Sequence, residues 1–131
     1  MSIGAIVRFM NLSSVYWLLV VDIVLTVSAQ LSLRAGALRL GEHGVSLNII
    51  LEPLKNIFLF VGVGLYAVSF FLYVFILSRL QLNVVYPVAT GAILVIIAIA
   101  SHFWLNESIT FPHVVGIAAI LIGIVLILLP K

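Results

Sequence analysis

The stretch from Ile57 to Ser78 is almost entirely apolar and contains no charged residue. A helix needs about 20 such residues to cross the hydrocarbon core of a bilayer. The whole chain has the same character, because only 8% of its 131 residues are charged and 65% are hydrophobic, whereas soluble domains are roughly 25% charged. A water-soluble globule of this length has too much surface for so few charges to cover. We therefore predict an integral membrane protein, which excludes the soluble classes.

Hydropathy predicts a single domain, residues 1–131, with four transmembrane helices. The predicted spans are 15–33, 57–78, 84–105 and 113–130. The first span is the weakest, because Asp22 and several hydroxyl and amide side chains interrupt it. Arg8, the apolar run and the small residues 27–29 also imitate a signal peptide, but a carboxylate within the run argues against that alternative. The expected fold class is an all-α membrane protein.

The segment between the first two spans is too apolar for a free loop and too short to cross a bilayer. Residues 46–55 include Leu47, Ile49, Ile50, Leu51 and Leu54, and Pro53 interrupts them. We predict an interfacial or re-entrant segment at residues 46–55. The alternative is an N-terminal extension of the second span.

The basic residues that normally set membrane orientation are evenly divided. Four spans put both termini on one side, which carries Arg8, Arg79 and Lys131, while the other side carries Arg34, Arg39 and Lys55. Cytoplasmic loops usually hold the excess of Lys and Arg, so an even division does not predict which side of the membrane the termini lie on. One hypothesis is insertion in both orientations and function as an antiparallel dimer. The other is a weak preference for termini inside, with Arg34 buried at its helix end.

Four polar residues follow one face of the first span, namely Asp22, Thr26, Gln30 and Arg34. They recur every fourth residue, so successive members are turned by only about 40°. Polar side chains in a membrane face the bundle interior or a water-filled cavity. A mid-span carboxylate can carry a proton or meet a cation, and a guanidinium suits phosphate or carboxylate through its planar fork of donors. We predict a substrate site along this stripe; the alternative is hydrogen bonding that only joins helices.

Two other spans contribute further candidates for the same cavity. Tyr66, Ser69 and Tyr73 sit at helical spacing in the second span, where they would either line the cavity or serve as packing residues. Tyr86 precedes Pro87 early in the third span. A proline frees a carbonyl group and bends the helix, which a cavity can use. Tyr66 and Tyr86 are therefore predicted to line the substrate site.

The fourth span carries a face of small residues. Gly116, Ala119 and Gly123 fall at i, i+3 and i+7, and small residues let helix backbones approach closely. We assign this face to dimer packing, with packing inside the monomer as the alternative.

The sequence offers little for enzyme, metal or nucleic-acid chemistry. It has no paired-carboxylate motif, nucleophile elbow or phosphate-cradling glycine-rich loop, so we predict a protein that is not an enzyme and uses no cofactor. It contains no cysteine and only three histidines, too few and too scattered for a metal centre. A net charge of +2 is no basic patch, so nucleic acid is not an expected partner.

Short motifs in a fixed order carry a resemblance to a known family. They are Leu-Tyr-Ala-Val-Ser-Phe at 65–70, Leu-Ser-Arg-Leu-Gln-Leu at 77–82, Val-Tyr-Pro at 85–87 and Leu-Asn-Glu-Ser-Ile-Thr at 105–110. Ala-Gln-Leu-Ser-Leu-Arg-Ala-Gly at 29–36 is similar to that family's Gln-Leu-x-x-Lys pattern, with arginine for lysine. This succession resembles the four-span, EamA-like group of the drug/metabolite transporter superfamily.

Two branches of that superfamily are compatible with the motifs. One comprises the small subunits that flip aminoarabinose-linked undecaprenyl phosphate, and the other comprises the small multidrug resistance exporters, which are proton-coupled antiparallel dimers. The exporters rely on a first-span glutamate where this chain has Thr26, and on a tryptophan where it has Ala89. The Tyr-Pro pair, the Ser-Arg-Leu turn and the long segment before the second span resemble the flippase branch.

The stripe and the resemblance together imply a small transporter or flippase of a bacterial or archaeal inner membrane. Its expected partners are membrane lipids, a second copy or a paralogue in a dimer, and an amphipathic substrate such as a polyprenyl-phosphate-linked sugar. We expect Arg34, with Arg79, to meet the anionic headgroup, and the isoprenoid tail to stay in lipid. The cavity would be lined by Asp22, Thr26, Gln30, Tyr66 and Tyr86. The alternatives are proton-coupled export of cationic compounds through Asp22, and a non-transporting scaffold subunit.

Overall fold

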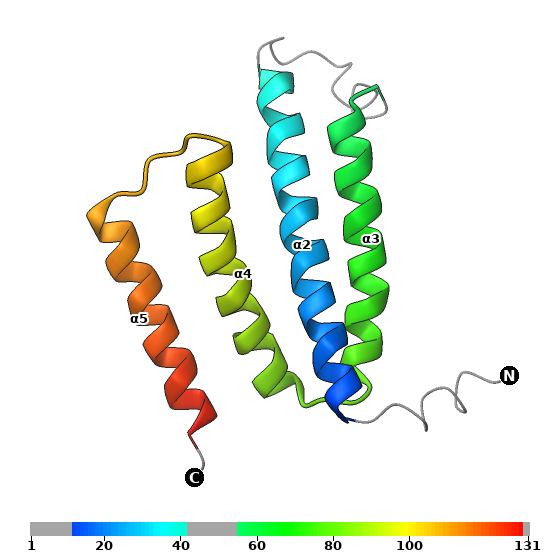
Figure 1. The fold of residues 1–131 in the computed structure, drawn as a ribbon, viewed down its shortest axis with the longest axis vertical. Helices are drawn as coiled ribbons and strands as arrows, with labels where there is room; N and C mark the ends of the chain where they lie inside the picture. The colour runs from blue at the N-terminus through cyan, green and yellow to red at the C-terminus, as the bar shows by residue number, and fades with distance from the viewer. Residues whose placement is uncertain (1–11, 42–54, 130–131) are drawn as a thin grey trace, which may run out of the picture.

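The described part of the chain, residues 12–41 and 55–129 of a computed structural model, consists of long α-helices, with short connections from α3 to α4 and from α4 to α5 (Figure 1). The helices are α2 (Leu12–Gly41), α3 (Ile57–Leu77), α4 (Leu82–Trp104) and α5 (Phe111–Leu128). Each of the four is long and apolar enough to cross a membrane. The predicted all-helical membrane fold is confirmed.

The first helix is longer than its predicted span, because it runs on from residue 33 to Gly41. No proline interrupts residues 34–41, and most of them favour helix. At the start of α3, Asn56 is the N-cap: its backbone is extended, with φ −94° and ψ 106°, and its side chain accepts a hydrogen bond from the backbone N–H of Phe58 at 3.1 Å. The described part of α3 therefore begins at Ile57, directly after this cap. Residues 46–54 of the predicted re-entrant segment lie outside the described residues.

The helices alternate in direction, so the ends of α2 and α4 meet the starts of α3 and α5 at one end of the bundle (Figure 1). Arg34, Arg39 and Lys55 belong to this end, and Arg79, in the turn between α3 and α4, belongs to the other. The described basic residues are thus divided as predicted. Arg8 and Lys131, which complete the predicted balance, lie outside the described residues.

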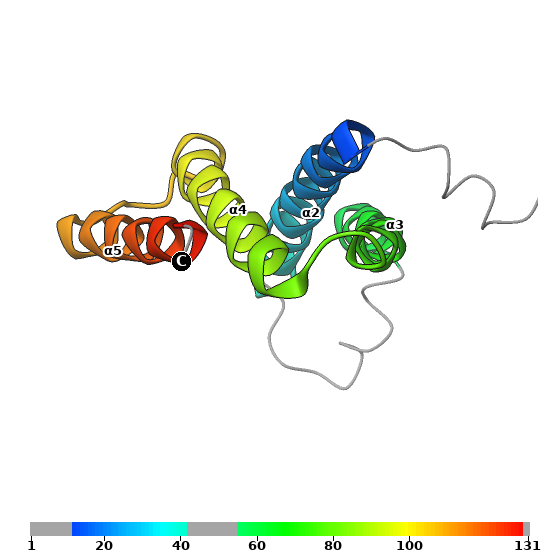
Figure 2. The ribbon, with the colours of Figure 1, turned by 90° about the horizontal axis from the view of Figure 1, so that it is seen from below.

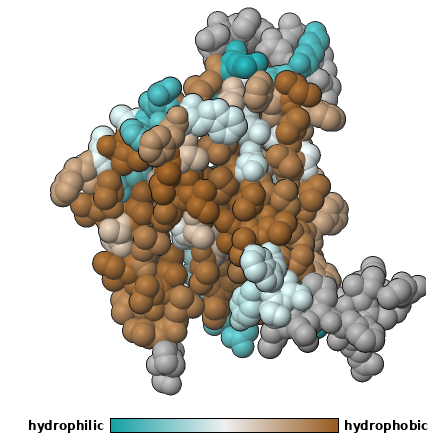
Figure 3. Space-filling model, in the orientation of Figure 1, coloured by the Kyte–Doolittle hydropathy of each residue, from teal (hydrophilic) through white to brown (hydrophobic). Residues whose placement is uncertain are grey.

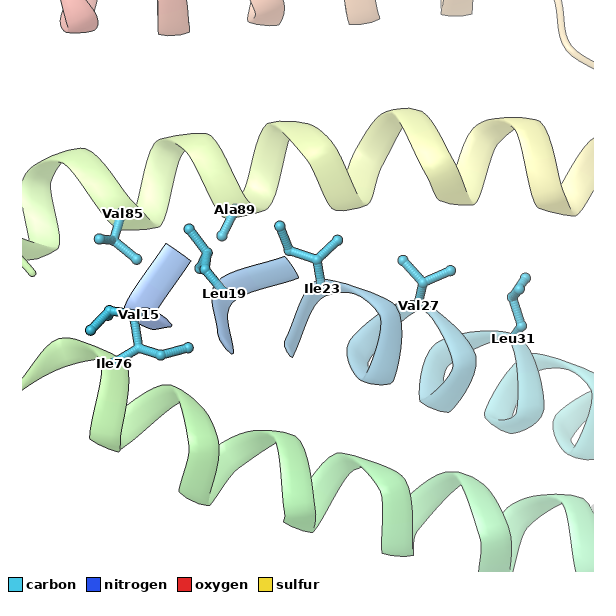
Figure 4. Packing of buried hydrophobic residues seen from close by; sticks show 8 residues of the cluster. All are labelled: Val15, Leu19, Ile23, Val27, Leu31, Ile76, Val85 and Ala89. Atoms are coloured by element: carbon cyan, nitrogen blue, oxygen red, sulfur yellow. The ribbon is translucent and has the colours of Figure 1, made fainter. Parts of the chain in front are cut away.

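The core of the bundle follows one face of α2, which packs between α3 and α4 (Figure 2). Figure 4 shows its buried side chains at four-residue spacing, facing Val85 and Ala89 of α4 with Ile76 of α3 close by; they are Val15, Leu19, Ile23, Val27 and Leu31. Lipid tails are as apolar as these side chains, so close packing rather than escape from water holds the helices together.

Two glycines allow the closest approach of α2 and α3. A Cβ atom at Gly62 would lie 2.8 Å from Leu33 Cγ and 3.0 Å from the Leu33 backbone nitrogen. One at Gly36 would lie 2.6 Å from Leu59 Cγ and 3.1 Å from the Leu59 backbone nitrogen. Small residues of this kind bring helix backbones together in membranes. Neither contact was predicted from the sequence.

The last helix, α5, lies on the outer side of α4 (Figures 1 and 2). It approaches α4 closely at Gly91, where an added Cβ would meet Ile124 Cδ1 and approach Leu121. In contrast, no atom lies within 4 Å of a Cβ added at Gly116 or Gly123. The contact with α4 thus leaves the small face of α5 open, and dimer packing at this face stays a prediction.

The surface matches a membrane protein in its distribution of polarity. Figure 3 shows an apolar band across the middle of the face in view, with polar residues toward its two ends. Trp17 and Trp104, 72% and 62% exposed, lie near opposite ends of the bundle. Tryptophan is enriched at the two membrane–water interfaces, so these residues mark the approximate edges of the apolar band.

Candidate functional site

A cavity of about 290 Å³ lies among α2, α3 and α4 in the middle of the bundle. It is lined by Asp22, Thr26, Gln30, Tyr66, Ser69, Phe70, Tyr73, Tyr86, Ala89, Thr90 and Ile93. The polar stripe of α2 thus forms one wall from Asp22 to Gln30, and a substrate site along it stays a prediction. Tyr66 and Tyr86 are about half exposed, so the cavity opens on the face of the bundle where these two rings lie.

A chain of hydrogen bonds holds the carboxylate of Asp22 at the wall of this cavity. The Ser69 hydroxyl donates to Asp22 Oδ1 at 2.6 Å, and the Thr26 and Ser69 hydroxyl oxygens are 2.7 Å apart. Since Ser69 has one hydroxyl proton and gives it to Asp22, Thr26 is the donor to Ser69. All three side chains are buried. The network fixes the carboxylate and joins α2 to α3.

The cavity offers more hydrogen-bonding capacity than its own residues use. Among the described residues, only Oδ1 of the Asp22 carboxylate is hydrogen-bonded, and the buried Tyr73 hydroxyl has no partner. Buried polar groups are usually hydrogen-bonded, because leaving them unpaired costs about 1–3 kcal/mol. A polar ligand with both donors and acceptors would satisfy these groups.

Arg34 lies beyond the cavity, at the end of the stripe, and it is already paired. Its Nε and Nη2 donate to one oxygen, Glu107 Oε1, at 2.9 and 2.8 Å. The loop between α4 and α5 presents Glu107: Asn106 has a left-handed backbone with φ 52°, and the carbonyl of Glu107 is 2.8 Å from His102 Nδ1. The Arg34 and Glu107 side chains are 54% and 40% exposed, so another anion can reach the guanidinium.

Arg79 is the predicted site residue that the structure separates from the others. It follows α3, whose 21 residues extend about 31 Å at 1.5 Å per residue, and Arg34 lies near the opposite end (Figure 1). One headgroup therefore cannot contact both guanidinium groups at once. The two arginines define two positions along the bundle.

Sequence reasoning missed part of the lining. The sequence left two roles for Ser69 and Tyr73, lining the cavity or packing between helices, and both residues line the cavity. Thr90 was not singled out, although it follows Tyr86 by one helical turn and a residue at i+4 lies on the same face. The partnership between Ser69 and Asp22 has no signal in the sequence, because it depends on how α2 and α3 are rotated. Within the described residues, no group of three or more His, Asp or Glu side chains could hold a metal ion.

Two curated proteins are similar to the chain. It is 32% identical over 108 residues to the "Probable 4-amino-4-deoxy-L-arabinose-phosphoundecaprenol flippase subunit ArnF" of Aeromonas salmonicida, a match that covers 81% of this chain and 73% of that protein. It is 31% identical over 64 residues to the uncharacterized protein y4nH of Sinorhizobium fredii, which covers 49% of this chain and only 55% of the relative. No protein-family model and no solved structure matches the chain.

Proposed function

Since the chain belongs to the four-span, EamA-like group of the drug/metabolite transporter superfamily, with the flippase subunit ArnF as a relative, we propose that it is a subunit of an inner-membrane flippase for a polyprenyl-phosphate-linked sugar. The observation that carries this proposal is the polar cavity among three apolar helices, joined by the stripe of α2 to a guanidinium at the membrane edge. The name of ArnF describes a lipid with an amino sugar and a phosphate. A sugar is recognised by groups that donate and accept hydrogen bonds, which the cavity provides. A phosphate is recognised by a guanidinium, which Arg34 provides.

The cavity suits the sugar part of such a headgroup. Its lining holds a carboxylate, an amide and several hydroxyl groups, which can donate and accept hydrogen bonds with sugar hydroxyls. Its volume, about 290 Å³, is near the lower end of the range for small-molecule sites, roughly 300–1,000 Å³. The carboxylate of Asp22 repels a phosphate, so the phosphate is expected elsewhere on the stripe.

The phosphate is assigned to Arg34. Arg34 and Asp22 are about 18 Å apart along the helix axis, farther than a sugar phosphate reaches, so the headgroup meets them in succession. Without a bound phosphate, the Arg34 guanidinium is paired with Glu107. An ion pair this exposed contributes only about 0–1 kcal/mol, and a phosphate with its bidentate geometry and higher charge can displace it.

Removing the Arg34 guanidinium tests the proposal. In vesicles that contain the purified protein with any subunit that copurifies, Arg34→Gln should slow translocation of a fluorescent short-chain polyprenyl phosphate sugar about 10- to 100-fold, the effect of losing a charged hydrogen-bonded contact. Arg39→Gln is the matched control, because Arg39 lies on the same helix and its guanidinium stacks 4.3 Å above the Phe58 ring. It should translocate at the normal rate.

Glu107→Gln separates a substrate contact from a structural ion pair. If Arg34 receives the phosphate, freeing it from Glu107 should preserve or tighten binding of the lipid, measured in the same vesicles as the concentration for half-maximal rate. Equal losses for Arg34→Gln and Glu107→Gln would mean that the pair only anchors the α4–α5 loop, and would contradict this part of the proposal.

A second function is favoured by one observation, the single carboxylate in the cavity. Asp22 is where a proton-coupled exporter of cations would carry its proton or its substrate. In the proposed flippase, Asp22 instead accepts hydrogen bonds. An uncharged hydrogen-bond acceptor in place of Asp22 should preserve the flippase and abolish proton-coupled export, so this substitution separates the two functions.

We also propose that the open face of α5 packs against a second copy or a paralogous subunit. Gly116→Leu or Gly123→Leu fills space that is empty around the monomer, so monomer folding should persist. Extra bulk in a close helix contact costs about 1–3 kcal/mol, so the dissociation constant of the dimer in detergent should rise about tenfold or more. Val125→Leu is the control, since Val125 lies on the other side of α5 and is 57% exposed. An unchanged dimer in both glycine variants would exclude this face.

A further inference from the structure

An apolar groove follows α3 beside the mouth of the cavity. It has a volume of about 350 Å³ and is lined by Leu33, Val63, Tyr66, Ala67, Phe70 and Phe71. The five lining residues of α3 fall at i, i+3, i+4, i+7 and i+8, which is one face of a helix. Of the six side chains, only that of Tyr66 carries a polar atom. From Val63 to Phe71 the groove extends about 12 Å along the helix, so it suits a short extended length of hydrocarbon.

Small residues create this hollow. Ala67 lies at its centre, with the larger side chains of Val63 and Phe71 one helical turn away on either side. Leu33 forms the α2 side of the groove, where Gly62 lets the two helices approach: a Cβ atom at Gly62 would lie 2.8 Å from Leu33 Cγ. Val63 and Phe71 are 60% and 74% exposed. The groove is therefore open along its outer side, which faces lipid.

The groove is continuous with the polar cavity. Tyr66 and Phe70, one helical turn apart on α3, line both of them. The cavity holds the Asp22 carboxylate and several hydroxyl groups, whereas the other groove residues are all hydrocarbon. Leu33 also directly precedes Arg34 on α2, so the groove adjoins both positions assigned to the headgroup. A ligand that fills the cavity and the groove together must be polar at one end and apolar at the other.

We propose that the groove binds the first isoprene units of a polyprenyl chain whose headgroup is in the cavity or at Arg34. This assignment deepens the proposed flippase function and rests on it. Membrane lipid tails are as apolar as the groove, so hydrophobicity alone does not select the occupant. A prenyl chain has a flat alkene in every unit, which makes it stiffer than a saturated acyl chain, so it loses less freedom when bound. Its flat surfaces can pack against the rings of Phe70 and Phe71.

The consequence for the substrate is a tail held by the protein. The sequence predicted that the isoprenoid tail stays in lipid. In the proposed arrangement the chain leaves the cavity past Tyr66, lies along Ala67 and enters the lipid beyond the groove. The first units of the tail, as well as the headgroup, then contribute to recognition.

Photolabelling in vesicles tests the groove directly. The probe is farnesyl phosphate with a diazirine on its chain, and mass spectrometry of peptides maps the labelled residues. We expect labelling on the face from Val63 to Phe71 that unlabelled farnesyl phosphate prevents. Ala67→Phe should reduce this labelling about tenfold or more, the effect of extra bulk in a close contact. Since Ala67 is exposed, the variant should fold.

Val68→Phe is the matched control. Val68 is the next residue on α3, is 57% exposed and lines neither the cavity nor the groove. This variant should be labelled as strongly as the unsubstituted protein, and both variants should unfold at its melting temperature. Competition by farnesyl phosphate is measured on the unsubstituted protein, so it decides the question even if Ala67→Phe proves unstable.

Each outcome either supports or overturns the assignment. Groove labelling that farnesyl phosphate prevents and that falls in Ala67→Phe supports it. Absent groove labelling, equal labelling in Ala67→Phe, or a groove covered by a second copy would overturn it. A phosphatidylglycerol with a diazirine in its acyl chain provides the comparison: equal groove labelling that farnesyl phosphate does not prevent would show that bulk lipid fills the groove, and would also overturn it.

This test can fail separately from the proposed function. Labelling requires no translocation. Competed labelling of the groove, together with normal translocation by Arg34→Gln, would contradict the role of Arg34 in the flippase and leave the prenyl site standing. Slow translocation by Arg34→Gln without groove labelling would do the reverse.

Discussion

Asp22→Leu should reduce translocation about 10- to 100-fold, whereas Asp22→Asn should keep it within about threefold. The leucine removes the acceptor for the buried Ser69 hydroxyl, while Thr26 keeps its contact with Ser69. The loss of such an acceptor costs about 1–3 kcal/mol, and every 1.36 kcal/mol changes a rate about tenfold. Asparagine keeps an oxygen at the same position and can still accept the 2.6 Å hydrogen bond from Ser69.

This pair of variants also decides between the two candidate functions. A proton-coupled exporter needs a group that can gain and lose a proton in the cavity, and asparagine cannot do so. Loss of exchange with Asp22→Asn, at normal protein levels in the membrane, would favour the exporter and count against the flippase. Ser69→Ala is the matched test of the network, because it removes the donor and leaves the carboxylate in place; its effect should lie between those of asparagine and leucine.

Gly62→Leu should destabilise the protein by about 2–3 kcal/mol, the upper range for overpacking. Even the first added atom would lie 2.8 Å from Leu33 Cγ and 3.0 Å from the Leu33 backbone nitrogen. The leucine side chain can move aside, but the backbone can move only if α2 and α3 separate. Separation would also draw Ser69 away from Asp22, so translocation should fall together with stability.

Gly64→Leu provides the control for this prediction on the same helix. No atom lies within 4 Å of a Cβ added at Gly64, so the same substitution meets only open space and should change stability by about 0.5 kcal/mol or less. Thermal unfolding in one detergent measures both variants. If the two variants unfold at the same temperature, bulk at position 62 does not separate α2 from α3, and the assigned contact is wrong.

Much of the fold follows from the sequence because membrane insertion is decided locally. A run of about 20 apolar residues is sufficient to identify a span, and the four predicted spans each correspond to one helix of the structure. The polar stripe is equally local, since its direction depends only on the pitch of one helix. For this reason, Asp22, Thr26 and Gln30 could be assigned to a cavity before any partner for them was known.

The partners themselves depend on contacts between helices that no local pattern records. Ser69 meets Asp22 because Gly36 and Gly62 let α2 and α3 approach at one rotation. The alternating direction of the helices puts Glu107 beside Arg34 and sends Arg79 to the opposite end. Composition and periodicity were enough to determine that the chain crosses the membrane and which face of α2 is polar, because those properties belong to single helices. Which side chains share a cavity, and which arginine pairs with Glu107, was decided only by the tertiary structure, because small side chains and backbone contacts fix the rotation and pairing of whole helices.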